Sequence, residues 1–222
     1  MNRLELELTR LYATQADASG VGALVLEVAD PAEWQPLAAV FQGLQADLDL
    51  PASAIAVNGR DAMQLWFSLA QPLPAADAVA FLELLRLRYM GHIKPHRVRL
   101  LAGALEPVPA LQAGTGMWSA FVAPDLASVM ADEPWLDLPP NPDGQAALLA
   151  RLQSIAPAAL QRAMAQLQPA AAPGGAAASA QPARGPREFL MDVMNDPAVA
   201  LALRIEAAKA VLPQPMGHPP DA

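Results

Sequence analysis

The sequence contains no cysteine, which excludes disulfide bonds, thiolate metal sites and a cysteine nucleophile. It also contains no apolar run close to the ~18 residues that a membrane-spanning helix needs. The first ten residues alternate charge with leucine, whereas a signal peptide has an uninterrupted apolar core there. We therefore expect a cytoplasmic protein that does not associate with a membrane.

Aromatic residues make up only 5% of the chain, and the net charge is −8. Because 54% of the 222 residues are apolar, the chain can build a core, mainly from leucine, valine, methionine and alanine. The acidic balance argues against nonspecific nucleic-acid binding by the whole surface, which needs clustered cations. Gly-x-Gly-x-x-Gly, Walker lysine and Gly-x-Ser-x-Gly motifs are missing. We therefore expect no cofactor and do not favour an enzyme.

A strand followed by a helix is predicted near the start of the chain. Residues 21–28 (VGALVLEV) form a continuous apolar run typical of a buried strand. Asp30 as N-cap, Pro31 at the first helical position and Glu33 at the third then predict a helix start. The apolar face of this helix consists of Leu37, Val40, Phe41, Leu44 and Leu48, and Pro51 ends it.

Asn58-Gly59 between two apolar runs predicts a β-hairpin of residues 54–58 and 62–69. A second amphipathic helix over residues 75–89 and a strand over 97–102 follow. The order strand, helix, strand, strand, helix, strand is typical of an α+β fold of ferredoxin-like or RRM-like type, with two helices on one face of an antiparallel sheet. The first fourteen residues fit a helix or an edge strand, and we favour the helix.

The rest of the chain is predicted to be irregular or helical. Residues 115–138 are broken by proline, and helices follow from Asn141 to about residue 154 and over 157–167. We expect one α+β domain over residues 1–168, with its core at about 20–102 and an extension at 115–168. Of residues 169–186, 15 of 18 are Ala, Pro or Gly, which predicts a disordered linker. A helical module over 187–213 would dock on a partner through Phe189, Leu190, Val193, Leu201, Ile205 and Leu212.

A basic run over residues 86–99 is the strongest functional signal, because it has five basic residues and no acid. RRM-like sheets hold single strands by stacking bases on aromatic residues beside cations. Alternation places Trp66 on the sheet face opposite Leu65 and Phe67, which we expect to be open. A solvated helix end, where cations favour the helix dipole, is the alternative. The candidate nucleic-acid-binding residues are Arg86, Arg88, Lys94, Arg97, Arg99 and Trp66.

Glu27 and Asp30 are weak candidates for a metal site, since divalent cations need convergent carboxylates. The competing interpretation is that Asp30 serves as the N-cap. His92 and His96 are four residues apart, but Gly91 and Pro95 interrupt any helix that would pair them. We therefore expect no metal.

Two segments resemble known families. The segment GRDAMQLWFSLAQPLP (59–74), leading into a helix, resembles the RRM-like catalytic half of the archaeo-eukaryotic primase superfamily. The family's Asp-x-Asp metal pair is missing, so the resemblance implies a non-catalytic, primase-like domain. The segment PREFLMDVMNDPAVALALRIEAAKAVLP (186–213) is similar to helices of phage terminase small subunits and mobile-element proteins. The middle segment, WSAFVAPDLASVMADEPWLDLPP (118–140), looks like bacterial proteins to which no function is assigned.

These patterns lead to a first hypothesis: a non-catalytic protein of bacterial or prophage origin that contacts single-stranded nucleic acid or a nucleic-acid enzyme. The alternative is a protein-interaction adaptor with no nucleic-acid role. A metal-dependent, primase-like nucleotidyl transferase is disfavoured, because the carboxylate pair is missing. A positive surface around residues 86–99 would favour the first hypothesis, and dispersal of those charges among acids would favour the adaptor.

Overall fold

The computed structural model describes residues 2–12 and 20–168, together with the single positions 191, 204 and 208. The chain divides into two compact units, residues 1–170 and 171–222. The predicted linker (169–186) lies outside the described residues. The same is true of all six predicted docking residues, Phe189, Leu190, Val193, Leu201, Ile205 and Leu212.

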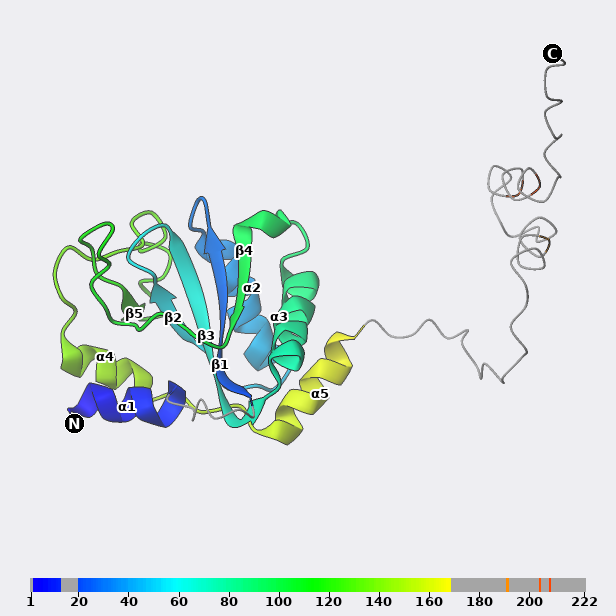
Figure 1. Cartoon of the computed structure of the whole chain (residues 1–222), viewed down its shortest axis with the longest axis horizontal. Coiled ribbons are helices and arrows are strands. Elements are labelled where there is room, and N and C mark those ends of the chain that lie inside the picture. Colours follow the sequence, from blue (N-terminus) through cyan, green and yellow to red (C-terminus); the bar gives the residue numbers. More distant parts are fainter. Residues whose placement is uncertain (1, 13–19, 169–190, 192–203, 205–207, 209–222) are drawn as a thin grey trace, which may run out of the picture. The chain divides into compact units, whose positions relative to one another are not determined.

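The first unit is built on one five-stranded antiparallel sheet, which confirms the mixed α+β class (Figure 1). The strand order across the sheet is β4–β1–β3–β2–β5, so β4 and β5 form its two edges. The long strands β1 and β3 pair in the centre, with Glu27 opposite Gln64. The strands are β1 (Val21–Ala29), β2 (Ala54–Val57), β3 (Ala62–Leu73), β4 (Val98–Ala102) and β5 (Ala120–Val122).

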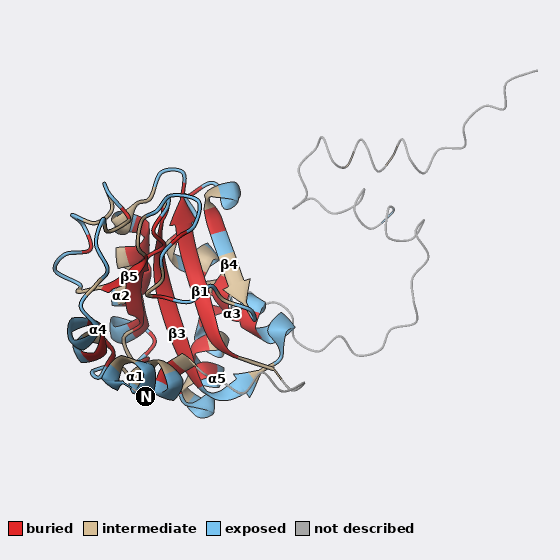
Figure 2. Ribbon diagram, turned by 60° about the vertical axis from the view of Figure 1, so that its left-hand side comes forward, coloured by how far each residue is buried: buried red, intermediate tan, exposed pale blue. Residues whose placement is uncertain are grey.

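Helices α2 (Trp34–Ala46) and α3 (Ala75–Tyr89) pack on one face of the sheet and form the main core with it. Because side chains alternate along a strand, every second residue of β1 and β3 points into this core. The predicted range of α3 is confirmed. A further helix, α5 (Pro157–Leu167), contacts α3 and β3. Figure 2 shows β1 and most of β3 buried, whereas the edge strand β4 and the outer sides of the helices are partly or wholly exposed.

The second face of the sheet is also covered, by α1 (Arg3–Tyr12) and α4 (Pro142–Leu149) and by residues 104–112. Trp66 lies on this face, as alternation predicts, but only 6% of it is exposed. The expectation that this face is open is therefore wrong. The helices that cover it come from the two ends of the unit, and Arg10 of α1 joins them by donating to the carbonyls of Leu149 and Leu152, each at 3.0 Å.

The predicted hairpin between β2 and β3 is confirmed. The Asn58 side chain holds the turn, because its Oδ1 accepts hydrogen bonds from the backbone N–H groups of Arg60, Asp61 and Ala62 at 2.9–3.0 Å. Gly59 has φ +77°, a left-handed conformation that favours glycine. A Cβ added there would lie 2.8 Å from the backbone nitrogen of Ser119, so the turn also needs glycine for close packing.

The predicted start of α2 is wrong. The helix begins at Trp34, with Glu33 as a cap residue whose side chain makes no capping hydrogen bond. Asp30 instead ends β1 with φ +53°, ahead of a cis bond to Pro31. Pro36 lies in the first turn of the helix, where a missing N–H has no effect. Both Pro31 and Pro36 are compatible with the start of a helix, but only Pro36 lies in α2, and Pro31 belongs to the connection between β1 and α2.

The remaining helices agree in place with the sequence pattern. α1 is the helix that we favoured, α5 matches its predicted range, and α4 is shorter than expected. Asn141 caps α4 by accepting a hydrogen bond from the backbone N–H of Asp143 at 3.0 Å. In the part of the chain that the structure describes, no helix has both the length and the apolar character to cross a bilayer.

Candidate functional site

Acids outside the basic run form ion pairs with three of its five cations. Arg97 lies in the 3-10 turn Pro95–Arg97, and its guanidinium donates to the carbonyls of Ala29 (3.2 Å) and Pro31 (2.6 Å). It also forms an ion pair with Glu33 at 3.2 Å. Arg97 therefore fastens the connection between β1 and α2 and is mostly buried.

Arg86 is held within α3 by Glu83, with two hydrogen bonds of 2.6 Å. The hydrogen bond from Arg86 lowers the pKa of Glu83 and raises that of Arg86. Two further candidates, Arg88 and Lys94, are exposed and form no ion pair within the described residues. The basic run thus contributes two unpaired cations to the surface.

Arg99, the fifth candidate, forms one end of a polar row that crosses three strands. Glu27 of β1 lies opposite Arg99 of β4 on one side and opposite Gln64 of β3 on the other. Arg99 Nη1 donates to Glu27 Oε1 at 2.8 Å, and this hydrogen bond raises the pKa of Arg99. Gln64 Nε2 donates to Glu27 Oε2 at 2.7 Å, and Trp66 Nε1 donates to Gln64 Oε1 at 2.7 Å. At the centre of the row is Glu27, which is only 3% exposed and accepts a hydrogen bond at each of its carboxylate oxygens.

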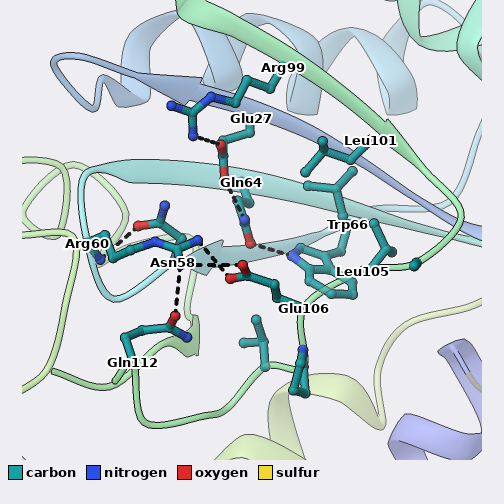
Figure 3. Close-up of a pocket in the computed structure, with 14 residues that line it drawn as sticks. Glu27, Asn58, Arg60, Gln64, Trp66, Arg99, Leu101, Leu105, Glu106 and Gln112 are labelled. Atoms are coloured by element: carbon teal, nitrogen blue, oxygen red, sulfur yellow. Dashed lines mark hydrogen bonds and ion pairs between the residues drawn. The ribbon is translucent and has the colours of Figure 1, made fainter. Parts of the chain in front are cut away.

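A second polar group faces this row across a cavity (Figure 3). Arg60, next to the hairpin turn, donates to both carboxylate oxygens of Glu106, the shorter contact being 2.7 Å. It also donates to Gln112 Oε1 at 3.1 Å. Glu106 and Gln112 belong to the segment after β4 that covers the second sheet face, so one wall of the cavity is formed by a long connection.

The cavity, which we call the sheet-face pocket, has a volume of about 250 Å³. The two polar groups described above line it, together with apolar side chains that include Trp66, Leu101, Leu105 and Val108. Two guanidinium and two carboxylate groups therefore surround a small, partly apolar space. Such a pocket with convergent polar groups is the default candidate for a small-ligand site.

The weak metal candidates, Glu27 and Asp30, are not joined by further ligands. Glu27 is already occupied by Arg99 and Gln64, while Asp30 is exposed at the end of β1. Among residues 2–12 and 20–168, no three His, Asp or Glu side chains are placed to hold a metal ion. Neither carboxylate therefore belongs to a recognisable metal site.

A second candidate surface follows β5, at the other edge of the sheet. The sequence has no lysine, arginine or histidine from residue 100 to 150, and six acids in that range. Four of them lie in residues 123–138, which we call the acidic–apolar segment, and all four are exposed: Asp125, Asp132, Glu133 and Asp137. The absence of cations from this range can be read from the sequence, but the functional prediction was based on the basic run and did not use it.

The acidic–apolar segment also exposes large apolar side chains. Leu126, Val129 and Leu138 are 52%, 67% and 75% exposed. The segment is nevertheless fixed, because Ala127 is fully buried and Leu136 exchanges backbone hydrogen bonds of 2.8 and 3.1 Å with Trp118. The apolar side chains are therefore presented from a segment that is anchored to the core.

Two hollows of about 440 and 380 Å³ lie in this surface. Val129 lines the larger and Leu126 the smaller, and the two hollows share Met130 and Leu136. The smaller one extends over β5 to Gln145 of α4, whose side-chain amide bonds both backbone groups of Phe121 at 2.7 and 2.9 Å. The outer edge of β5 is thus occupied by a side chain.

Comparisons with protein-family models, curated proteins and solved structures find no match for this chain, so its possible functions rest on its own sequence and geometry.

Proposed function

We propose that the first unit is a non-catalytic protein-interaction adaptor whose partner is a basic, amphipathic polypeptide segment. The observation that carries this proposal is the acidic–apolar segment. Val129 lines a hollow together with Asp132, Glu133 and Asp137, exposed leucines lie close by in the sequence, and no basic residue occurs from position 100 to 150. Contiguous apolar surface rimmed by polar residues is typical of protein-interaction sites. Charge complementarity indicates lysine or arginine on the partner.

The placement of the basic run supports the adaptor over nucleic-acid binding. Three of the five candidate cations are paired with Glu83, Glu33 and Glu27, and a paired cation has fewer counterions to release to a phosphate backbone. Trp66 packs against Tyr12 and Phe121, with ring centroids 5.3 and 5.9 Å away, and is only 6% exposed, so it presents no open surface on which the bases of a strand could stack. Dispersal of the charges among acids is the arrangement that we associated with the adaptor.

We also propose that residues 21–102 form a ferredoxin-like unit. The element order β1–α2–β2–β3–α3–β4, the sheet order β4–β1–β3–β2 and the packing of α2 and α3 on one face support it. In a four-stranded unit of this kind β2 would be an edge strand, but here β5 pairs with β2 and forms the edge of the sheet instead. The resemblances to primases and to terminase small subunits stay predictions.

The proposal is tested by photo-crosslinking from Val129 in cells that contain the protein, followed by binding measurements with the purified partner. We expect a discrete polypeptide whose affinity falls at least about tenfold in Leu126→Asp, because burying an aspartate in an apolar contact is unfavourable. Leu87→Asp is the matched control, since Leu87 is 57% exposed, close to the 52% of Leu126, but lies on α3. The affinity should also decrease as salt is raised.

Single-stranded DNA and RNA serve as the opposing probes. If either binds with an affinity that falls steeply with salt and that Arg88→Ala or Lys94→Ala weakens, the nucleic-acid hypothesis replaces the adaptor. If the crosslinked polypeptide binds Leu126→Asp and wild type equally, the acidic–apolar segment is not the docking surface.

A further inference from the structure

We infer that the sheet-face pocket is a binding site for a small organic anion, a carboxylate or a phosphate monoester with an apolar body. The anionic group would lie between Arg60 and Arg99, and the apolar body against Trp66, Leu101 and Leu105. This inference is independent of the proposed protein partner, because it concerns the second sheet face and not the acidic–apolar segment.

The first argument is the presence of Glu27 in the middle of a sheet. A buried ion pair is weak evidence for stability, since apolar residues of similar volume often replace it without loss. Val25 and Trp66, the next positions on this face, are apolar, whereas Arg99 lies directly opposite position 27, so apolar residues at 27 and 99 together would suit the fold. Glu27 does fix one guanidinium nitrogen of Arg99 at the edge of the pocket, and a guanidinium has five N–H donors. Arg99 therefore keeps donors for a ligand while its position is held.

The second argument is the weakness of the contact between Arg60 and Glu106. Glu106 is 63% exposed, and exposed ion pairs contribute little to stability, so an incoming anion can take its place on Arg60. With Glu106 released into solvent, the pocket contains two guanidinium groups and one carboxylate. A carboxylate ligand, with one negative charge, then balances the site, and a phosphate monoester, at about −1.5 to −2, more than balances it. Gln112 adds an amide NH2 group with no hydrogen-bond partner among the described residues, and such a group can donate to the same anion.

The third argument is the size and lining of the cavity. At about 250 Å³ it is smaller than the ~300–1,000 Å³ typical of sites for drug-sized ligands, so it suits a small metabolite rather than a polymer. One side is apolar, and the planar fork of an arginine matches both carboxylate and phosphate oxygens. These features select an anionic head group on a compact apolar body.

The test uses the full chain with three probes: phenylacetate, phenyl phosphate and the neutral 2-phenylethanol. Binding is measured by calorimetry and by the rise in melting temperature that a ligand of the folded state produces. We expect at least one of the two anions to bind and the neutral probe to bind at least about tenfold more weakly, because it lacks the charge-assisted hydrogen bonds. Comparison of the two anions distinguishes a carboxylate ligand from a phosphate ester.

Two single variants with opposite expected effects guard against a trivial folding defect. Arg60→Gln should weaken the anion at least about tenfold, since it removes a charged donor. Glu106→Gln should strengthen it about two- to fivefold, because the competing carboxylate is gone and an exposed ion pair is worth that much. A gain of affinity cannot result from misfolding. Arg88→Gln, an exposed arginine outside the pocket, is the control and should change nothing.

The double variant Glu27→Met with Arg99→Met tests the role of the buried pair. It should keep the melting temperature of the free protein within a few degrees and abolish anion binding. If the double variant does not fold, the opposite effects of Arg60→Gln and Glu106→Gln decide the matter. The inference is overturned if neither anion binds wild type at millimolar concentration, if 2-phenylethanol binds equally well, or if Glu106→Gln fails to strengthen binding.

Discussion

Replacement of Gln145 by leucine tests whether one side chain closes an edge of the sheet. The amide of Gln145 accepts a hydrogen bond from Phe121 N at 2.7 Å and donates one to Phe121 O at 2.9 Å. Both residues are buried, so Gln145→Leu leaves a backbone N–H and a C=O without partners and out of water. Each unpaired buried group costs about 1–3 kcal/mol, and we expect a loss of about 2–5 kcal/mol after the gain from the added apolar surface.

Urea unfolding monitored by circular dichroism measures this loss directly. Gln161→Leu is the control, because Gln161 is an exposed residue of α5 whose side chain forms no hydrogen bond to the sheet among the described residues, and we expect its effect to stay within about 0.5 kcal/mol. A loss below about 1 kcal/mol in Gln145→Leu would refute the reasoning, since it would mean that Phe121 finds other partners.

Gln145→Glu sharpens the test because it keeps the shape of the side chain. An ionised carboxylate can accept from Phe121 N but repels Phe121 O, whereas a protonated carboxyl serves both groups. The folded state therefore raises the pKa of the substituted carboxyl. A raised pKa means that the stabilisation is complete below the unfolded-state pKa of about 4.3 and is lost as pH rises through the folded-state pKa. Relative to wild type, the variant should be most stable in acid, and a loss that does not change with pH would contradict the hydrogen-bonding scheme.

Three further predictions follow from local features. Gly59→Ala should destabilise the protein by at least about 1–2 kcal/mol in urea unfolding, because φ is +77° and backbone atoms are too close. Gly144→Ala on α4 should stabilise it slightly, because an added Cβ there would make only an ordinary contact of 4.0 Å with Asn141. Ser53→Ala should stabilise it by about 1 kcal/mol or more in the same assay, because the buried Ser53 Oγ has no hydrogen-bond partner in the described part of the chain; an unchanged midpoint would mean that this hydroxyl is satisfied. Burial raises the pKa of both tyrosines, Tyr12 and Tyr89. In a pH titration, the absorbance of tyrosinate should therefore appear at higher pH than for free tyrosine. The free energy of unfolding should decrease as pH rises above about 10, because the tyrosines ionise there only in the unfolded chain. A normal titration with a midpoint near pH 10 would contradict this burial.

Local patterns predicted the local structure well. The Asn58-Gly59 turn, the central strands and α3 depend on nearby residues, and periodicity with turn chemistry is enough to find them. Asp30 was mistaken for a helix cap because its spacing to Pro31 and Glu33 fits a cap, while the actual connection needs a left-handed residue before the helix. Local sequence does not distinguish the two.

The candidate sites depended on contacts between distant residues, which periodicity cannot supply. The pairing of Arg99 with Glu27 spans 72 positions, so a run without acids in the sequence is not a run without acids in space. Covering of the Trp66 face likewise needs α1 and α4, which are separated by more than a hundred residues. The acidic–apolar segment could have been predicted from the sequence, because no lysine, arginine or histidine occurs between positions 100 and 150.

The one-signed charge beyond β5 has a kinetic consequence. Exposed carboxylates gathered at one edge of a sheet produce a field that reaches about one Debye length, roughly 8 Å at physiological ionic strength. This field attracts a cationic partner and orients it before the two surfaces are in contact, so the association rate constant increases. Added salt should then slow association far more than it speeds dissociation, because the electrostatic part of recognition acts mainly before contact and the apolar part, through Leu126 and Val129, after it.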